Sequence, residues 1–229
     1  MKKEKLCTYC GKPASDREHV FPKCLYPTSK SKSEIQRLTI PACNECNNGW
    51  ADDEAHFRNA MVLAGKPGGI ANELWEAVQR SFKKSDGRRR VKDIILQLKP
   101  VERNNYKIYP GQDERVIRVV KKIIRGLSHH HKIMTAVPES LVWVNILKFQ
   151  IPENFLAEMD CSHREEDIVR YRYQILNDYK NDIYSAWIIT FLGRVPFIGT
   201  VSFSETMKSN FARGCPSVDN LQLNAPDDR

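Results

Sequence analysis

Cys7-Thr8-Tyr9-Cys10 and Cys43-Asn44-Glu45-Cys46 are two cysteine pairs of identical C-x2-C spacing, and they decide the fold of this chain. Two such pairs are typical of one four-cysteine zinc site, in which each thiolate lies about 2.3 Å from the ion. Gly11 permits the tight turn that follows the first pair. A redox C-x-x-C site is the alternative, but it needs only one pair, at a strand-to-helix junction. The remaining cysteines are expected to be core or incidental residues: Cys24, Cys161 and Cys215.

A helix is predicted after the second pair, beginning near Asp52 or somewhat earlier. Acidic residues crowd its start, and apolar residues recur beyond it at helical spacing: Phe57, Ala60, Met61 and Ala64. About 60 residues of this kind bury too little surface to be secure alone. We therefore expect the metal to supply much of the folding free energy of this unit.

The segment Ser15–Lys23, between the two pairs, contains Glu18 directly followed by His19 in a short strand-like stretch that Pro22 closes. Alternation along a strand sends neighbouring side chains to opposite faces unless the backbone twists. The two groups would therefore have to straddle a metal or reach around an edge to share one site. A surface carboxylate beside a hydrogen-bonded histidine is the alternative interpretation.

Three elements in order, Cys7-x2-Cys10-Gly11, Glu18-His19-Val20-x-Pro22 and Cys43-Asn44-x-Cys46-Asn47, resemble the zinc-containing branch of the HNH endonucleases. The resemblance covers about residues 5–64, and its specificity comes from the order and spacing of the three elements. It implies an N-terminal nuclease unit with the treble-clef-like ββα-metal fold.

The resemblance also implies roles for individual residues. In that family the acidic residue before the first histidine binds a divalent cation, which carries over to Glu18, and the histidine is the general base, which carries over to His19. The residue after the last zinc cysteine completes the metal site, which carries over to Asn47, with Asn48 as the alternative. Oxygen ligands suit Mg²⁺ or Mn²⁺. The four thiolates of Cys7, Cys10, Cys43 and Cys46 leave zinc no open position, so zinc would be structural.

One departure concerns the middle of the motif. Family members usually have an asparagine about five residues before the third cysteine, where it steadies the catalytic histidine, and this chain has Gln36-Arg37-Leu38-Thr39-Ile40 there. Gln36 or Thr39 would have to substitute for it. The departure bears on the positioning of His19.

Charge is unevenly distributed along the 229 residues, which carry 36 Lys and Arg against 28 Asp and Glu. Residues 1–50 have 9 basic and 5 acidic residues, residues 51–150 have 19 and 11, and residues 151–229 have 8 and 12. The basic part suggests a polyanionic partner, and solvated charge is the alternative. No apolar run approaches the roughly 18 residues of a membrane span, and no signal peptide precedes the first cysteine. A reducing, cytoplasmic setting without a membrane partner is expected.

Beyond the motif, Gly65–Gly69 predicts a break and a helix is expected over Ala71–Lys84. A basic turn over Lys83–Lys92 is expected to lead into a strand over Val91–Leu98. Its arginines are candidates for phosphate contact, with a solvated hairpin tip as the alternative: Arg88, Arg89 and Arg90.

Glu114–Leu127 has the clearest helical pattern of the chain. Its apolar face consists of Val116, Val119, Val120, Ile123, Ile124 and Leu127. The other face is expected to carry Arg115, Arg118, Lys121, Lys122 and Arg125, of which Arg118, Lys122 and Arg125 are predicted to contact nucleic acid. A merely soluble helix face is the alternative. His129, His130 and His131 follow, where a helix-terminus or phosphate contact is as good an interpretation as a metal site.

Strands are predicted from residue 141 onward: Leu141–Phe149, Tyr171–Leu176, Ile183–Phe191 and Val195–Phe203. Gly193 and Arg194 predict a tight hairpin between the last two, so the sheet should be mainly antiparallel. The chain is thus expected to be α+β, with a nuclease unit over residues 1–66, an α+β domain over 67–215 that positions substrate or binds a partner, and a flexible tail over 216–229.

Together these patterns predict a metal-dependent endonuclease that hydrolyses DNA, with structural zinc and catalytic Mg²⁺ or Mn²⁺. RNA remains an alternative substrate, and restriction and phage defence are frequent settings of the proteins it resembles. The C-terminal domain is the expected site of a protein partner or of homo-oligomer contacts. A zinc-binding adaptor for nucleic acid or protein, with a degenerate nuclease site, is the alternative function.

Overall fold

A computed structural model describes residues 5–27, 37–64, 68–83, 86–97, 99–101, 104–108, 112–148, 151–159, 161–165, 168–205 and 207–208. For 99–101, 104–108 and 161–165 the description covers the backbone alone. The chain folds as a mixed α+β protein with antiparallel sheets, as the sequence predicts. No helix among the described residues is both long enough and apolar enough to cross a bilayer.

An antiparallel hairpin and two helices follow the first cysteine pair. Strand β1 (Asp16–His19) pairs with β2 (Thr39–Ala42), and the short 3-10 helix η1 (Lys23–Leu25) lies between them in the chain. Helices α1 (Asn44–Asn48) and α2 (Ala51–Ala64) come next. Three carboxylates occupy the first turn of α2, where they oppose the positive end of the helix dipole. The predicted helix is therefore confirmed, and a separate short helix precedes it.

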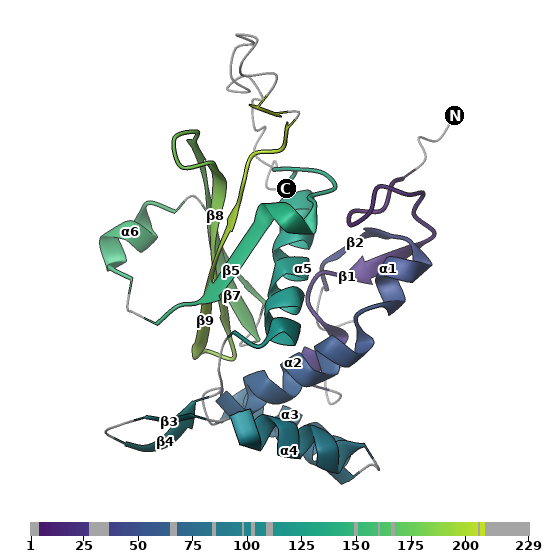
Figure 1. Ribbon diagram of the computed structural model, residues 1–229, viewed down its shortest axis with the longest axis vertical. Coiled ribbons are helices and arrows are strands. Elements are labelled where there is room, and N and C mark those ends of the chain that lie inside the picture. Colours follow the sequence, from purple (N-terminus) through teal and green to yellow (C-terminus); the bar gives the residue numbers. More distant parts are fainter. Residues whose placement is uncertain are drawn as a thin grey trace, which may run out of the picture.

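Helices α3 (Gly69–Lys83) and α4 (Gly87–Gln97) form a pair at the foot of the molecule (Figure 1). A Cβ on Gly87 would lie 2.2 Å from the carbonyl oxygen of Ser81, so only glycine allows this close approach between the helices. The strand predicted over Val91–Leu98 is wrong, because residues up to Gln97 are helical. The β-branched side chains of this segment favour a strand. The helical spacing of its apolar residues Val91, Ile94 and Ile95 favours a helix, and the structure follows this second signal.

The larger sheet has the order β5-β9-β8-β7-β6, with every neighbouring pair antiparallel. Its strands are β5 (Val142–Ile146), β6 (Cys161–Glu165), β7 (Val169–Asp178), β8 (Ile183–Phe191) and β9 (Val195–Val201). The 3-10 helix η2 (Glu139–Leu141) precedes β5, and α6 (Glu153–Ala157) connects β5 to β6. A separate hairpin pairs β3 (Lys99–Val101) with β4 (Asn104–Ile108).

Helix α5 (Glu114–His130) lies between the N-terminal hairpin and the sheet (Figure 1). Asp113 caps it by accepting a hydrogen bond of 2.9 Å from the backbone N–H of Arg115. Its approach to the sheet is close, because a Cβ on Gly199 of β9 would lie 2.4 Å from Cδ1 of Ile124. On its other side, a Cβ on Gly126 would meet Val20 at 3.2 Å. The helix is therefore packed on two sides, and every residue of its predicted apolar face is buried.

The remaining secondary-structure predictions can be compared directly. The strand over Ile183–Phe191 and the helices over Ala71–Lys84 and Glu114–Leu127 are confirmed, the last extending to His130. Six aromatic side chains in and next to the larger sheet are buried or half-buried: Tyr171, Tyr173, Trp187, Phe191, Phe197 and Phe203. One continuous hydrophobic cluster runs from Cys7 to Val201, so the predicted boundary at residue 66 does not divide the core. The tail over 216–229 and Cys215 lie outside the described residues.

Candidate functional site

The two cysteine pairs meet in space. The sulfur atoms of Cys7, Cys10, Cys43 and Cys46 all lie within 4.8 Å of one another, and those of Cys10 and Cys43 are 3.6 Å apart. A tetrahedral zinc ion with bonds of about 2.3 Å needs thiolates about 3.8 Å apart. The four cysteines therefore form a cluster that fits a metal such as zinc, as the sequence predicts.

Local backbone geometry forms each half of the cluster. Around the first pair, the N–H of Gly11 donates to the carbonyl of Cys7 at 2.9 Å, and Gly11 has a φ of 73° that favours glycine. Cys43 caps helix α1, and its carbonyl accepts from the N–H of Asn47 at 2.9 Å. The N–H of Thr8 donates to the carbonyl of Pro41 at 3.0 Å, which joins the first turn to β2.

The thiols differ in acidity according to their surroundings. Burial raises the pKa of Cys7, but hydrogen bonds from the backbone around Cys43, Cys10 and Tyr9 lower it more, to a net pKa of about 7. This sulfur is therefore easily converted to the thiolate that a metal requires. Burial raises the pKa of Cys24 to about 12, and its thiol donates to the carbonyl of Glu54 at 3.3 Å. Cys24 lies outside the cluster.

Glu18 and His19 occupy opposite faces of the hairpin. Glu18 pairs with Ile40 and His19 with Thr39 across the strands, and residues directly opposite one another share a face. Glu18 is buried on the inner face, whereas His19 is half-buried at the end of β1. Thr39, one of the two residues that could replace the missing asparagine, is thus the direct neighbour of His19. Gln36, the other, lies outside the described residues.

Asn47 reaches the same hairpin from α1. Its side-chain Nδ2 donates to the Oδ2 atom of Asp16 at 2.8 Å. Asp16 and Glu18 are two positions apart in β1 and therefore lie on one face. Asn48 is exposed. Glu18 and His19 of β1 and Asn47 of α1 thus lie on neighbouring elements of one unit. Asp16, which was not among the predicted site residues, belongs to the same group.

Glu18 has partners that sequence reasoning missed. The ammonium of Lys122, on α5, contacts the carboxylates of both Glu18 and Glu54, and Lys122 is fully buried. Each carboxylate uses its Oε1 atom for this contact. Burial raises the pKa of Glu18, and the positive charge of Lys122 partly offsets the increase. A single ammonium therefore compensates two carboxylates in a protected position between α2, α5 and β1.

Two arginines of α5, Arg118 and Arg125, connect the helix to the N-terminal residues. Arg118 donates to both oxygens of Asp53, at 2.8 and 3.0 Å, and this pairing raises its pKa. Arg125 donates to the backbone carbonyls of Tyr9 and Val137, both at 2.6 Å. The expectation that Lys122 and Arg125 lie on a solvent-facing surface for nucleic acid is wrong, since 0% and 5% of their surfaces are exposed. Helix α5 is covered on two sides, which its sequence pattern does not reveal.

The other predicted phosphate contacts lie on α4. Arg88 and Arg89 are exposed in its first turn, and Arg90 is half-buried, where it pairs with Asp52 at 3.3 Å. The three arginines therefore lie on α4, which contacts the start of α2 through the ion pair between Arg90 and Asp52.

The histidine run ends α5. Burial lowers the pKa of His129, His130 is exposed, and Nε2 of His131 lies 3.0 Å from the hydroxyl of Tyr171. The ring of His131 also packs 4.6 Å from that of Tyr173. His131 is therefore part of an aromatic contact with the sheet.

Comparison of the chain with known protein families, curated proteins and solved structures identifies no related protein. No protein-family model matches the chain, and neither the curated proteins nor the solved structures contain a match. Its function must therefore be inferred from its own residues.

Proposed function

We propose that the protein is a metal-dependent endonuclease of the HNH type, in which the hairpin, α1 and α2 form a zinc-stapled ββα nuclease unit. The observation that supports the proposal is the contact between β1 and α1. The cysteine cluster links the turn before β1 to the start of α1, and Asn47 is hydrogen-bonded to the strand that carries Glu18 and His19. An imidazole, carboxylates and an amide therefore belong to one small unit.

The donor set fits a hard divalent cation. Glu18 and Asn47 would hold Mg²⁺ or Mn²⁺ through oxygen atoms, which these ions prefer. The contact with Lys122 uses Oε1 of Glu18, and the hydrogen bond to Asp16 uses the nitrogen of Asn47. Among the described residues, no contact uses Oε2 of Glu18 or Oδ1 of Asn47, so both are available as acceptors. The cation, when bound, would stabilise the negative charge that develops on the phosphate.

His19 supplies the proton acceptor. A neutral imidazole takes a proton from the attacking water, and a general base of this kind typically contributes 10²–10⁴-fold to the rate. His19 lies at the last position of β1 on the face that Thr39 shares. Thr39 is the cross-strand partner of His19, and its hydroxyl accepts a hydrogen bond of 2.8 Å from Nε of Arg17.

DNA is the proposed substrate, with RNA as the alternative. The formal net charge of +8 attracts a polyanion, and the exposed cations of α4 stand beside the start of α2. Phosphate contacts hold the backbone without reading its sequence.

Plasmid cleavage by the full, zinc-loaded chain tests this proposal. Cutting should require added Mg²⁺ or Mn²⁺, and His19→Ala should lower the rate by about 10²–10⁴-fold. Glu18→Gln and Asn47→Ala should raise the metal concentration that gives half-maximal cleavage. His130→Ala is a matched control, since this exposed imidazole lies at the end of α5, and its rate should equal that of the wild type.

Two results would contradict the nuclease assignment. Equal cutting by the wild type and His19→Ala would show that His19 is not the general base. Cutting without any added divalent cation would show that the reaction needs no such ion. Zinc content is measured in each sample, so that loss of the structural ion is not mistaken for loss of catalysis.

A zinc-binding adaptor is the second candidate function, and the position of Lys122 favours it. The ammonium lies between two carboxylates, as a metal ion would in an active site, and therefore already compensates part of their charge. An adaptor would bind nucleic acid or protein but cut no DNA with any divalent cation.

A further inference from the structure

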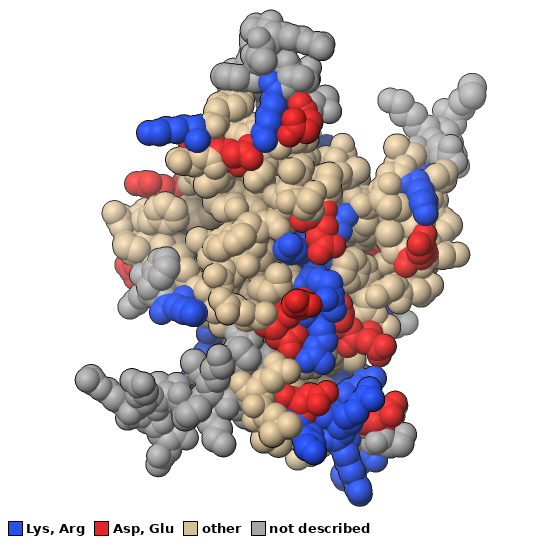
Figure 2. Space-filling model, viewed as in Figure 1, with Lys and Arg blue, Asp and Glu red and all other residues tan. Residues whose placement is uncertain are grey.

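A group of exposed cations lies at the end of α3 and along α4. Arg80 and Lys83 are in the last turn of α3, and Arg88 and Arg89 are in the first turn of α4. Figure 2 shows the resulting group of basic side chains at the foot of the molecule. Its exposed, described members are Arg80, Lys83, Arg88, Arg89 and Lys92, and within the described ranges none of them forms an ion pair.

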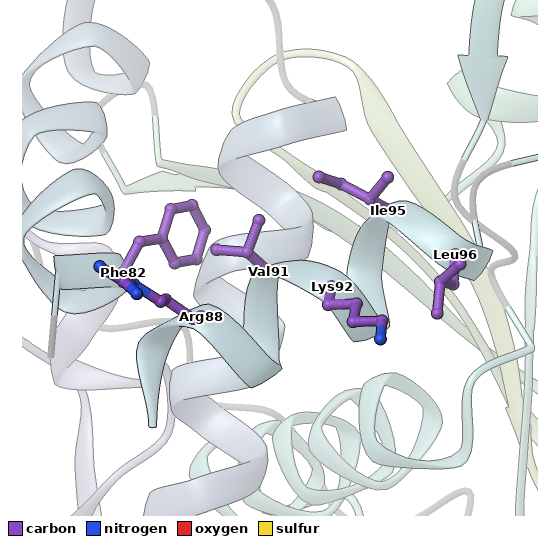
Figure 3. Close-up of a pocket in the computed structure, with 6 residues that line it drawn as sticks. All are labelled: Phe82, Arg88, Val91, Lys92, Ile95 and Leu96. Carbon is purple, nitrogen blue, oxygen red and sulfur yellow. The ribbon is translucent and has the colours of Figure 1, made fainter. Parts of the chain in front are cut away.

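An apolar hollow of about 330 Å³ adjoins these cations (Figure 3). Figure 3 shows the ring of Phe82 pointing toward Val91, with Arg88 on the neighbouring turn. The complete lining is Phe82, Arg88, Val91, Lys92, Ile95 and Leu96. Ile95 and Leu96 are 53% and 72% exposed, so this apolar part of the lining faces solvent. The hollow therefore combines an apolar floor with two positive side chains.

Aromatic surface continues along α3. Trp75 is 38% exposed and lies seven residues before Phe82, a half-buried ring that packs against the core, so both are on one face of the helix, two turns apart. Exposed rings beside cations are the usual means of binding unpaired nucleotides, because bases stack on the rings while the cations contact phosphates.

We propose that this basic hollow binds a single-stranded segment of nucleic acid, with a base over the apolar floor and phosphates against Arg88, Arg89 and Lys92. The inference deepens the proposed nuclease function, because it assigns the substrate a docking surface and an unpaired form. The ion pair between Arg90 and Asp52 links this surface to the start of α2, two residues before Glu54.

Charge complementarity favours a polyanion as the occupant. The hollow has cations at its rim, and the flanking exposed positions of α3 and α4 add three more. An acidic protein helix would satisfy the same charges. It would not, however, require the planar surfaces of Phe82 and Trp75, which match the faces of bases.

Fluorescence anisotropy with a labelled single-stranded oligonucleotide and its duplex tests the inference. The full chain carries His19→Ala and no divalent cation is added, so binding is measured without cleavage. Replacing Arg88, Arg89 and Lys92 together by glutamine should raise the Kd for the single strand at least tenfold. It should also reduce the slope of log Kd against log salt by about two, since each lost phosphate contact removes about 0.7.

The matched control removes the same charge elsewhere. Lys132, Lys180 and Arg194 are exposed and lie outside α3 and α4, and their joint replacement by glutamine should leave the Kd within twofold and the slope unchanged. Phe82→Leu keeps an apolar side chain but removes the ring. It should weaken single-strand binding about fivefold or more while leaving duplex binding unchanged.

Three outcomes would overturn the proposal: equal effects of the two triple variants, a preference for the duplex, or displacement of the oligonucleotide by poly-glutamate at equal charge concentration. The last would assign the surface to an acidic protein partner. Failure of the nuclease proposal is distinguishable, because cleavage is absent from this assay and the binding result stands without it.

Discussion

Substitution of Cys43 by serine is expected to abolish zinc binding and to lower the Tm of the full chain by more than about 10 °C. Four sulfur atoms within 4.8 Å of one another hold the turn before β1 against the start of α1. Removing one thiolate leaves three ligands and forfeits most of a binding free energy that reaches about 10–16 kcal/mol in small zinc domains. A loss of even about 5 kcal/mol shifts the Tm of a chain of this size by roughly 10–20 °C.

Atomic absorption and thermal denaturation followed by circular dichroism measure both effects. Cys24→Ser is the matched control, because this thiol donates to a backbone carbonyl and lies outside the cluster. It should keep one zinc per chain. Retention of zinc by Cys43→Ser, or equal loss in both variants, would disprove the assignment of the four ligands.

Lys122→Met is expected to destabilise the folded protein by about 3–5 kcal/mol. Methionine nearly matches lysine in length, but it leaves the carboxylates of Glu18 and Glu54 facing each other without a positive charge. Both side chains are largely shielded from water, so solvent compensates little of the repulsion. The loss should be smaller in the double variant with Glu54→Gln, because that change removes one of the two negative charges.

Urea denaturation of the zinc-loaded chain provides the measurement. Lys121→Met is the control, since Lys121 is the half-exposed neighbour on α5, and its free energy of unfolding should stay within about 0.5 kcal/mol of the wild type. If both lysine variants unfolded at the same urea concentration, the buried ion pairs would contribute nothing to stability.

Residue patterns within a short segment were sufficient to predict individual helices and strands. The aromatic and β-branched residues of Ile183–Phe191 identify β8 to the residue, and the apolar spacing of Val116 to Leu127 identifies α5. The pattern of α5 could not show that a second surface covers its cations. Lys122 is 104 residues from Glu18 and 68 from Glu54, and no local rule connects charges over such distances.

The candidate site was predictable in part for the same reason. Repeated C-x2-C spacing is sufficient to predict the cysteine cluster, because two such pairs are a typical arrangement of zinc ligands. The position of Asp16 could also have been predicted from the sequence, since strand alternation puts Asp16 on the same face as Glu18. The contribution of Lys122 depends on how α5 packs against the hairpin, which is a property of the tertiary fold.

Anomalous diffraction tests most directly whether Glu18 and Asn47 hold a divalent cation in the unit that carries His19. Crystals of the full chain are soaked in Mn²⁺, and data are collected at the manganese and zinc edges. We predict zinc among the four cysteines and a separate manganese peak about 2.2 Å from oxygens of Glu18 and Asn47. A structure in which manganese binds elsewhere, while Glu18 and Asn47 keep only Lys122, Glu54 and Asp16 as neighbours, would contradict it.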